Sequence, residues 1–209
     1  ITSILCYRKD GLDDILWALT REVVKCLSTG RTKDCIEARG YECQSVEALT
    51  GYPSILGGRV KTLHPKVFGG ILNRRDNEGD RQQIAQYDIP EIDLVIVDLY
   101  PFAATVASGA SDADIIEKID IGGISLIRGA AKNYKDVVIV ASKAQYGILA
   151  DMLKEHGAES SLEERRLLAR NAFIVTSGHD HNRLNYFAGT RKPPPHRTTL
   201  DHPITRRYG

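Results

Sequence analysis

Two continuous apolar runs constrain the fold of this chain more than any other feature of its sequence. One run is LVIV at 94–97, inside an expected strand at 93–99, and the other is VVIV at 137–140, inside an expected strand at 136–141. Strands that are apolar at every position, rather than at alternate ones, are typical of parallel sheets covered on both faces. We therefore predict a parallel sheet with helices packed on either side of it.

The rest of the chain alternates between strand and helix patterns. Further strands are expected at 2–7, 23–27 and 42–46, and helices at 12–19, 32–38, 111–119, 123–132 and 143–155, with one or two closing helices over 161–187. Right-handed crossovers bring the loops after such strands to one edge of the sheet, where ligands bind. The predicted fold class is α/β, a three-layer α/β/α sandwich with a mainly parallel sheet.

The character of the sequence changes near residue 190. The stretch KPPP at 192–195 cannot be helical because proline lacks an amide hydrogen, and the rest of the chain to Gly209 is polar and basic. We predict one domain over 1–189 and a linker or tail over 190–209.

Composition narrows the classes of protein to consider. The formal charge of +1 leaves no global basic footprint for nucleic acid, and no apolar run approaches the roughly 20 residues that span a bilayer. We expect no signal peptide, since no charged and then apolar leader is present, and the missing initiator Met indicates that the first residues are absent. The cysteines form no C-x-x-C pair and have no histidine cluster beside them, so we expect no metal, reduced thiols and a cytoplasmic location; they are Cys6, Cys26, Cys35 and Cys43.

The segment 57–66, GGRVKTLHPK, is the strongest candidate for a binding site. Its two glycines let the backbone approach a ligand closely, because neither carries a Cβ. Arg59, Lys61 and Lys66 follow with three cations, and Thr62 adds a hydroxyl. Guanidinium and ammonium groups beside a glycine turn suit an anion such as a phosphate. An ordinary charged surface loop is the alternative, and composition alone does not separate the two.

Four further loops belong to the same predicted edge. Lys9 follows the first strand, the turn 28–32 (STGRT) precedes a helix, Tyr100 follows the strongest strand, and Asp120 precedes another helix. A hydroxyl-rich turn at a helix start can cradle a phosphate, although this one matches neither the Walker nor the G-x-G-x-x-G pattern. Each feature also has a plain structural interpretation: a charged turn, an N-cap by Ser28 or Thr29, a tyrosine packed over the core, and a capping aspartate.

Three motifs then occur in order: GGRVKTLHP at 57–65, DLYPF at 98–102, and IDIGG at 119–123 followed by AAKN at 130–133. With them, residues 2–187 resemble IMP cyclohydrolase, the N-terminal half of the bifunctional purine biosynthesis enzyme AICAR transformylase/IMP cyclohydrolase. The resemblance implies a methylglyoxal-synthase-like fold, in agreement with the alternation of strands and helices. It also implies that 190–209 leads into an absent transformylase domain.

The activity implied by the resemblance is purine ring closure in de novo purine biosynthesis. In 5-formamidoimidazole-4-carboxamide ribotide (FAICAR) the carboxamide nitrogen attacks the formyl carbon, and water leaves to give IMP; the enzyme class is a hydrolase acting on a cyclic amidine. No cofactor is implied for this domain, and 10-formyltetrahydrofolate would serve only the absent half, which would make the full-length protein an AICAR formyltransferase as well. The implied partners are the purine ribotide and a second copy in a homodimer, with no nucleic acid and no membrane.

The resemblance also assigns site residues. Asp120 would orient or deprotonate the carboxamide, while Lys61, Tyr100 and Lys132 would stabilise the oxyanion and relay protons. His64 and Pro65 are predicted to shape the turn, and Lys66 is the cation least expected to matter. The implied substrate-binding residues are Lys9, Ser28, Gly30, Thr32, Arg59, Thr62, Ile121, Gly122 and Gly123.

Three departures from the family pattern stand out, and related functions stay open. Arg31 replaces a glycine of the phosphate turn, Gly129 replaces a helical alanine, and His179 stands where an aromatic tyrosine is usual. A methylglyoxal synthase-type lyase would also need a phosphate site and a carboxylate base. A non-catalytic nucleotide-sensing module of the same fold would have no use for the four catalytic groups together, and a cyclohydrolase made inactive by Arg31 is a third alternative.

Overall fold

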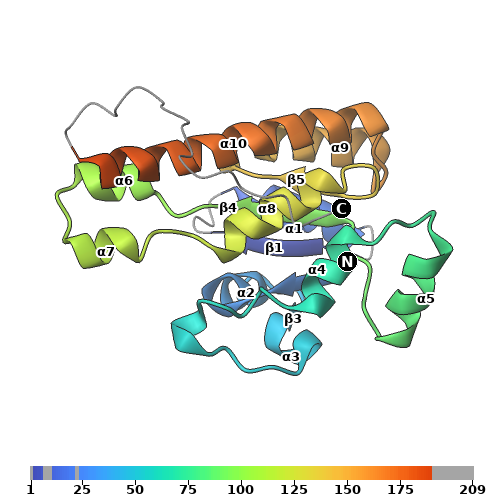
Figure 1. The fold of residues 1–209 in the computed structure, drawn as a ribbon. Coiled ribbons are helices and arrows are strands. Elements are labelled where there is room, and N and C mark those ends of the chain that lie inside the picture. The colour runs from blue at the N-terminus through green and yellow to red at the C-terminus, as the bar shows by residue number, and fades with distance from the viewer. Residues whose placement is uncertain (1, 7–10, 22–23, 190–209) are drawn as a thin grey trace, which may run out of the picture.

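A computed structural model of the chain describes residues 2–6, 11–21 and 24–189, with the backbone alone for 2–6 and 20 (Figure 1). Within this part, five strands form one sheet in the order β3-β2-β1-β4-β5, and every pairing is parallel. The strands are β1 (Thr2–Cys6), β2 (Cys26–Ser28), β3 (Cys43–Ser45), β4 (Leu94–Asp98) and β5 (Val138–Val140). The predicted parallel sheet is confirmed.

Strand β4 shows why the sequence has continuous apolar runs. Val95 and Val97 belong to the hydrophobic core on one face of the sheet, whereas Leu94 and Ile96 belong to the core on the other face. All four side chains are at most 6% exposed. Alternate side chains of a strand point to opposite faces, so a strand buried on both sides is apolar throughout.

Helices cover both faces of the sheet, as Figure 1 shows, and give the three predicted layers. One face carries α1 (Leu12–Arg21), α2 (Gly30–Glu37) and α9 (Tyr146–His156), and the other carries α4 (Pro65–Leu72), α8 (Gly122–Lys132) and α10 (Leu162–Ala188). The closing region is therefore one helix of 27 residues, begun by a capping box between Ser161 and Glu164. Among the described residues, no helix is long and apolar enough to cross a membrane.

Several short helices were not expected from the sequence. They are α3 (Val46–Thr50), α5 (Glu78–Gln86) and α6 (Phe102–Ala107), while the helix expected at 111–119 is only α7 (Asp112–Ile116), and short 3₁₀ turns lie at Leu56–Gly58 and Lys143–Gln145. Helix α5 buries none of its residues, so it has no apolar stripe to detect. Helix α4 was also missed, because it contains two glycines, which disfavour a helix. Gly70 is required there, because a Cβ at this position would lie 2.3 Å from the carbonyl oxygen of Pro90.

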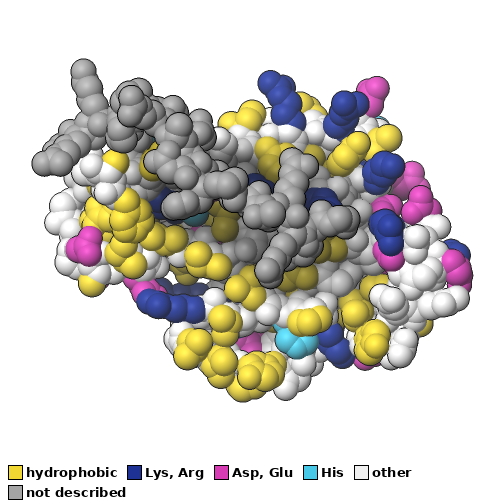
Figure 2. All heavy atoms as spheres, in the orientation of Figure 1, with side chains coloured by type: hydrophobic (Ala, Val, Ile, Leu, Met, Phe, Trp, Pro, Cys, Tyr) yellow, Lys and Arg dark blue, Asp and Glu magenta, His cyan; other side chains and the backbone are white. Residues whose placement is uncertain are grey.

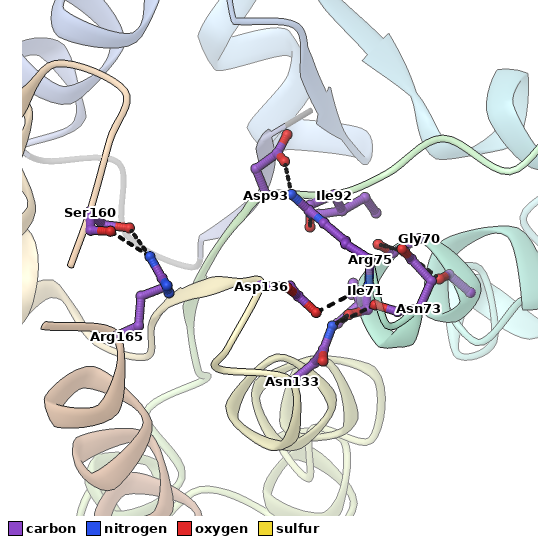
Figure 3. A network of polar contacts seen from close by, with 11 residues as sticks. Gly70, Ile71, Asn73, Arg75, Ile92, Asp93, Asn133, Asp136, Ser160 and Arg165 are labelled. Carbon is purple, nitrogen blue, oxygen red and sulfur yellow. Dashed lines mark hydrogen bonds and ion pairs between the residues drawn. The ribbon is translucent and has the colours of Figure 1, made fainter. Parts of the chain in front are cut away.

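Hydrogen bonds close the amino-terminal edge of the sheet (Figure 3). Arg75 Nη1 donates to Asp93 Oδ1 at 2.7 Å, immediately before β4. Asn133 Nδ2 donates to the carbonyl oxygens of Ile71 and Asn73, each at 2.9 Å. Since Asn133 directly follows α8, these bonds fix the C-terminal end of α8 at the edge of the sheet opposite the loops that follow the strands.

Candidate functional site

The strand order places the expected ligand crevice. Strand β1 lies at the centre of the sheet, with β2 and then β3 on one side of it and β4 and then β5 on the other. Ligands of open parallel sheets bind outside the carboxyl ends of the strands at such a reversal, here between β1 and β4. Lys9, which follows β1, lies outside the described residues. Tyr100 follows β4 and is 44% exposed, as expected for a side chain at the edge of the sheet rather than over the core.

The turn that opens the 57–66 segment has an unusual backbone. Leu56, Gly57 and Gly58 have φ angles of 53°, 66° and 86°, all in the left-handed region. The turn is closed by the amide of Gly58, which donates to the carbonyl oxygen of Ile55 at 2.8 Å. Glycine adopts this conformation freely, but for Leu56 it costs about 1–2 kcal/mol. Retained strain of this kind is concentrated at functional sites.

Lys61 and Thr62 join this turn to two other parts of the chain. The Lys61 ammonium lies 3.6 Å from the place where a Cβ on Gly58 would stand, and 3.8 Å from the corresponding place on Gly30. Buried Thr62 has its hydroxyl oxygen 2.7 Å from the place where a Cβ on Gly122 would stand. The 57–62 segment, the turn before α2 and the start of α8 therefore meet in one place.

The last residues of the segment have the structural role predicted for them. His64 is the N-cap of α4, and its Nδ1 accepts a hydrogen bond from the Lys66 amide at 3.1 Å. Pro65 is the first residue of that helix, a position that tolerates its missing amide hydrogen. The Lys66 ammonium lies 3.7 Å from an Asp88 carboxylate oxygen, so this cation is paired away from the glycine turn.

The loop between α7 and α8 brings two further residues, Glu117 and Lys118, to the candidate site. Arg59 forms an ion pair with Glu117. The Lys118 ammonium lies 5.4 Å from the centre of the Tyr100 ring, within the range of a cation–π contact. This loop therefore ties Arg59 and Tyr100 to the start of α8. Glu117 and Lys118 carried no motif, and only the folded chain shows which residues they meet.

Asp120 combines a capping contact with an environment suited to a base. Its Oδ1 accepts a hydrogen bond from the Gly123 amide at 2.7 Å. Burial raises the pKa of the Asp120 carboxyl, and the Gly123 amide, His179 and Arg183 offset part of that rise. A Cβ on Gly123 would stand 2.6 Å from Asp120 Oδ2, so the glycine leaves room for the carboxylate. The cap and the base were alternatives in the sequence, but the structure allows one carboxylate to serve as both.

The turn before α2 lies between the end of β2 and the start of α2, where the sequence predicted it. Ser28 and Thr32 are buried, while Gly30 is exposed with a φ of 43°. Thr29 occupies the N-cap position of α2, but its side chain makes no capping hydrogen bond. A plain N-cap by Thr29 therefore does not explain the turn. Arg31 is exposed, and so is Ile121 beside Asp120.

Lys132 is the predicted catalytic residue that the described chain does not bring to the site. It is the last residue of α8, whereas Asp120 precedes the first. The helix rises about 1.5 Å per residue, so roughly 15 Å separates its two ends. Lys132 lies next to the hydrogen bonds of Asn133 at the amino-terminal edge of the sheet.

Two cavities lie away from the gathered residues. One of about 410 Å³ opens at the amino-terminal edge, near Arg75, Asp93 and Asp136. Another of about 360 Å³ lies beside α5. Among the residues that the structure describes, neither cavity is lined by the predicted site residues.

Fold and loop arrangement define the class of this protein. The family model of the MGS-like domain matches residues 11–125, and the chain belongs to this family. The family described as AICARFT/IMPCHase bienzyme matches residues 130–209. The methylglyoxal-synthase-like fold predicted from the sequence is thereby confirmed.

Individual relatives are more specific. The chain is 71% identical over 181 residues to the bifunctional purine biosynthesis protein PurH of Bacteroides thetaiotaomicron, covering 87% of this chain and 36% of that protein. It is 48% identical over 182 residues to PurH of Rhodopirellula baltica, covering 87% and 35%. The crystal structure of ForH matches with a TM-score of 0.76 at 32% identity, covering 90% of this chain and 98% of that one. The resemblance to this part of the bifunctional enzyme is confirmed, and the chain spans about a third of the length of these curated relatives.

Proposed function

We propose that this chain closes the purine ring by converting FAICAR to IMP. One observation carries the proposal: the Lys61 ammonium lies between two glycine turns, and the hydroxyl of the adjacent Thr62 lies against Gly122, two residues from the partly buried carboxylate of Asp120. A ribotide needs an anion-binding turn and an acid–base group a short distance apart. The likeness to PurH proteins supports the same reaction.

The chemistry follows from the character of each group. Asp120 accepts a hydrogen bond from the Gly123 amide, which leaves its second oxygen, Oδ2, for the substrate carboxamide. As the amide nitrogen loses its proton and attacks the formyl carbon, negative charge develops on the formyl oxygen. The Lys61 ammonium and the Tyr100 hydroxyl stabilise that oxyanion and supply the proton for the departing water. Because the two reacting groups belong to one molecule, positioning supplies much of the acceleration.

Substrate holding is assigned to the loops around these groups. The phosphate and ribose lie against the turn before α2 and the glycine turn, with Lys9 contributing from the loop after β1. Placing the phosphate near the amides at the start of α2 and α8 uses the favourable end of each helix dipole. The residues assigned to holding are Lys9, Ser28, Gly30, Thr32, Arg59, Thr62, Ile121, Gly122 and Gly123.

Lys132 and the homodimer are proposed together. Within one chain Lys132 lies at the far end of α8 from Asp120, so we assign its catalytic role to the site of a second copy. Exposed apolar side chains near the glycine turn support a second copy there, since Tyr52 and Leu56 are 56% and 69% exposed. Figure 2 shows hydrophobic side chains gathered along this lower edge of the molecule. Mixing inactive K61A and K132A proteins restores activity if the sites are shared, and restores none if they are not.

The proposal includes a cofactor-free reaction in the cytoplasm. Protons and charge are handled by side chains alone, so the ring closure calls for no electron carrier and no group carrier. Cys26, Cys35 and Cys43 are free thiols, as is usual in a reducing compartment. The transformylase activity, with 10-formyltetrahydrofolate, is proposed for the part of the full-length protein that this chain does not include.

The test supplies FAICAR and follows the absorbance of IMP. We expect wild-type activity, and losses on the order of 10²–10⁴-fold in kcat for D120N. Y100F and K61A test the oxyanion role in the same assay. A wild-type chain that binds IMP but forms none would refute the enzyme and favour a nucleotide-sensing module or a site inactivated by Arg31. Formation of methylglyoxal from dihydroxyacetone phosphate would favour the lyase instead.

A further inference from the structure

The inner face of α10 changes character along its length. Its buried residues recur at helical spacing, apolar at first and then polar: Leu168, Ala172, Thr176, His179 and Arg183. His179 and Arg183 are only 7% and 8% exposed. A stripe at this spacing faces the core, where a buried arginine is rare unless it is paired. The polar end of the stripe therefore needs a partner on the elements that it packs against.

The Arg183 side chain connects three parts of the fold. Its Nη1 donates to the carbonyl oxygen of His179 at 2.5 Å, and its guanidinium carbon lies 4.2 Å from the centre of the Phe102 ring at the start of α6. Its Nη2 makes a long contact, 3.5 Å, with the carbonyl oxygen of Lys118. Figure 1 shows α6 beside the C-terminal end of α10, in agreement with these contacts. Arg183 thereby fastens α10 to the loop that carries Asp120.

These contacts do not satisfy the buried guanidinium. The Nε of Arg183 and the Nε2 of His179 are both buried without a hydrogen-bond partner in the described part of the chain. The acidic groups that act electrostatically on Arg183 are Asp180 and, with a smaller effect, Asp120. The Asp180 side chain is 73% exposed and lies 3.2 Å from His179 Nδ1, so water screens it. Asp120 is less exposed, so water screens its smaller effect on the buried cation less.

We propose that Arg183 is a positioning residue that keeps Asp120 ionised and holds its loop against α10. Asp120 accepts a hydrogen bond from the Gly123 amide of α8, and His179 and Arg183 of α10 act on its carboxylate electrostatically. Burial lowers the pKa of Arg183 to about 10, so the guanidinium remains charged at neutral pH. Burial also lowers the pKa of His179, so this imidazole is neutral there and Arg183 is the cation that acts on Asp120; His179 adds its charge only at lower pH, where it is protonated. A carboxylate can act as a base only while it is ionised. By lowering the pKa of Asp120, Arg183 keeps this carboxylate ionised at lower pH.

The inference rests on the proposed function for its activity readout, but a direct titration tests it separately. The carboxyl carbon of Asp120 is followed by carbon-13 NMR against pH in wild type, R183M and R183K, with D120N to assign the signal. We expect R183M to raise the pKa of Asp120, because it removes the charge and keeps an apolar stem, and R183K to stay near wild type. R183Q, whose amide can still donate to the His179 carbonyl, replaces R183M if that variant does not fold cooperatively.

R128M is the matched control. Arg128 also stacks on an aromatic ring between α8 and α10, with its guanidinium carbon 5.8 Å from the centre of Phe173, but it is exposed and is not among the groups that act on Asp120. We expect Asp120 to titrate in R128M as in wild type. An Asp120 titration in folded R183M or R183Q that matches wild type overturns the inference, and so does an equal rise in R128M.

The activity readout then shows whether the effect matters for catalysis. In R183M the acid limb of kcat/KM against pH moves to higher pH, with about tenfold lower activity for each pH unit of the displacement. Activity on the alkaline side of that limb stays near wild type, because the carboxylate is ionised there in both proteins. A loss that is the same at every pH indicates a merely structural role and overturns the inference. An inactive wild type refutes the proposed function instead, while the NMR titration still decides on Arg183.

Discussion

Replacing Gly129 by alanine is the change that the structure predicts to stabilise this protein. Gly129 lies inside α8, where glycine is less favourable than alanine by about 1 kcal/mol. Its φ is not in the left-handed region, so alanine adopts the same backbone without strain. A Cβ built at this position meets Phe68 Cε1 at 3.6 Å and Ile71 Cγ2 at 3.7 Å, which are ordinary van der Waals contacts. The methyl group therefore fills space between α8 and α4 and displaces no neighbour.

The magnitude is the sum of two effects. Helix propensity contributes about 1 kcal/mol, and partial burial of a methyl group adds a fraction of the roughly 0.8 kcal/mol of a fully buried one. We expect G129A to raise the free energy of unfolding by about 1–1.5 kcal/mol. For a domain of this size that raises Tm by about 2–6 °C. Urea unfolding measures the change as a higher midpoint at unchanged m value.

Two glycine variants separate the causes. Gly178, in the middle of α10, meets nothing within 4 Å of a built Cβ, so G178A reports propensity alone. G70A is expected to destabilise, because its Cβ would lie 2.3 Å from the Pro90 carbonyl oxygen. If G129A gains no more than G178A, the contact with Phe68 and Ile71 contributes nothing. If G129A destabilises while G178A stabilises, the packing of α8 on α4 described above is wrong.

Three further outcomes are expected. Arg74 holds the pKa of Asp80 down at about 2, so the stability that Asp80 contributes is complete above about pH 4 and is lost as pH falls towards 2. Unfolding of wild type and D80N from about pH 2 to 6 measures this contribution. A stability difference between the two proteins that does not change with pH would contradict the prediction. G122A places a new Cβ 2.7 Å from the hydroxyl oxygen of Thr62, so we expect KM for FAICAR to rise while the fold persists. An unchanged KM would show that this contact is not part of the substrate-binding site. L126A empties a fully buried position in α8 and lowers the free energy of unfolding by about 2–5 kcal/mol in urea, whereas a loss below about 1 kcal/mol would show that the core collapses around it.

Strand-level features were readable from sequence because they depend on neighbouring residues. The apolar runs identified β4 and β5, and the motifs at 57–65 and 119–123 marked loops that the fold does bring together at Gly122. The helices that were missed are the ones whose local pattern is weak, such as α5, which buries no side chain. His64 and Pro65 were placed correctly at a turn, since the capping preferences of a helix start are local.

Contacts between distant segments were not readable in this way. The pairing of Arg59 with Glu117 joins residues 58 positions apart, and nothing in either local sequence selects the other. The distance between Asp120 and Lys132 could have been predicted from the sequence, because the helix expected between them keeps its two ends apart. The family resemblance assigns both residues to one site and takes no account of that distance.

By itself the sequence determined the parallel α/β fold, the family, and the kinds of group at the strand ends, because burial on both faces of a sheet and the chemistry of short motifs are written locally. Only the tertiary structure decided that Lys61 lies between two glycine turns, that Lys132 lies at the opposite edge of the sheet, and that α10 brings Arg183 to the loop that carries Asp120. Those facts depend on how helices dock on the sheet. That docking is set by packing over the whole core, and no single segment of the chain carries it.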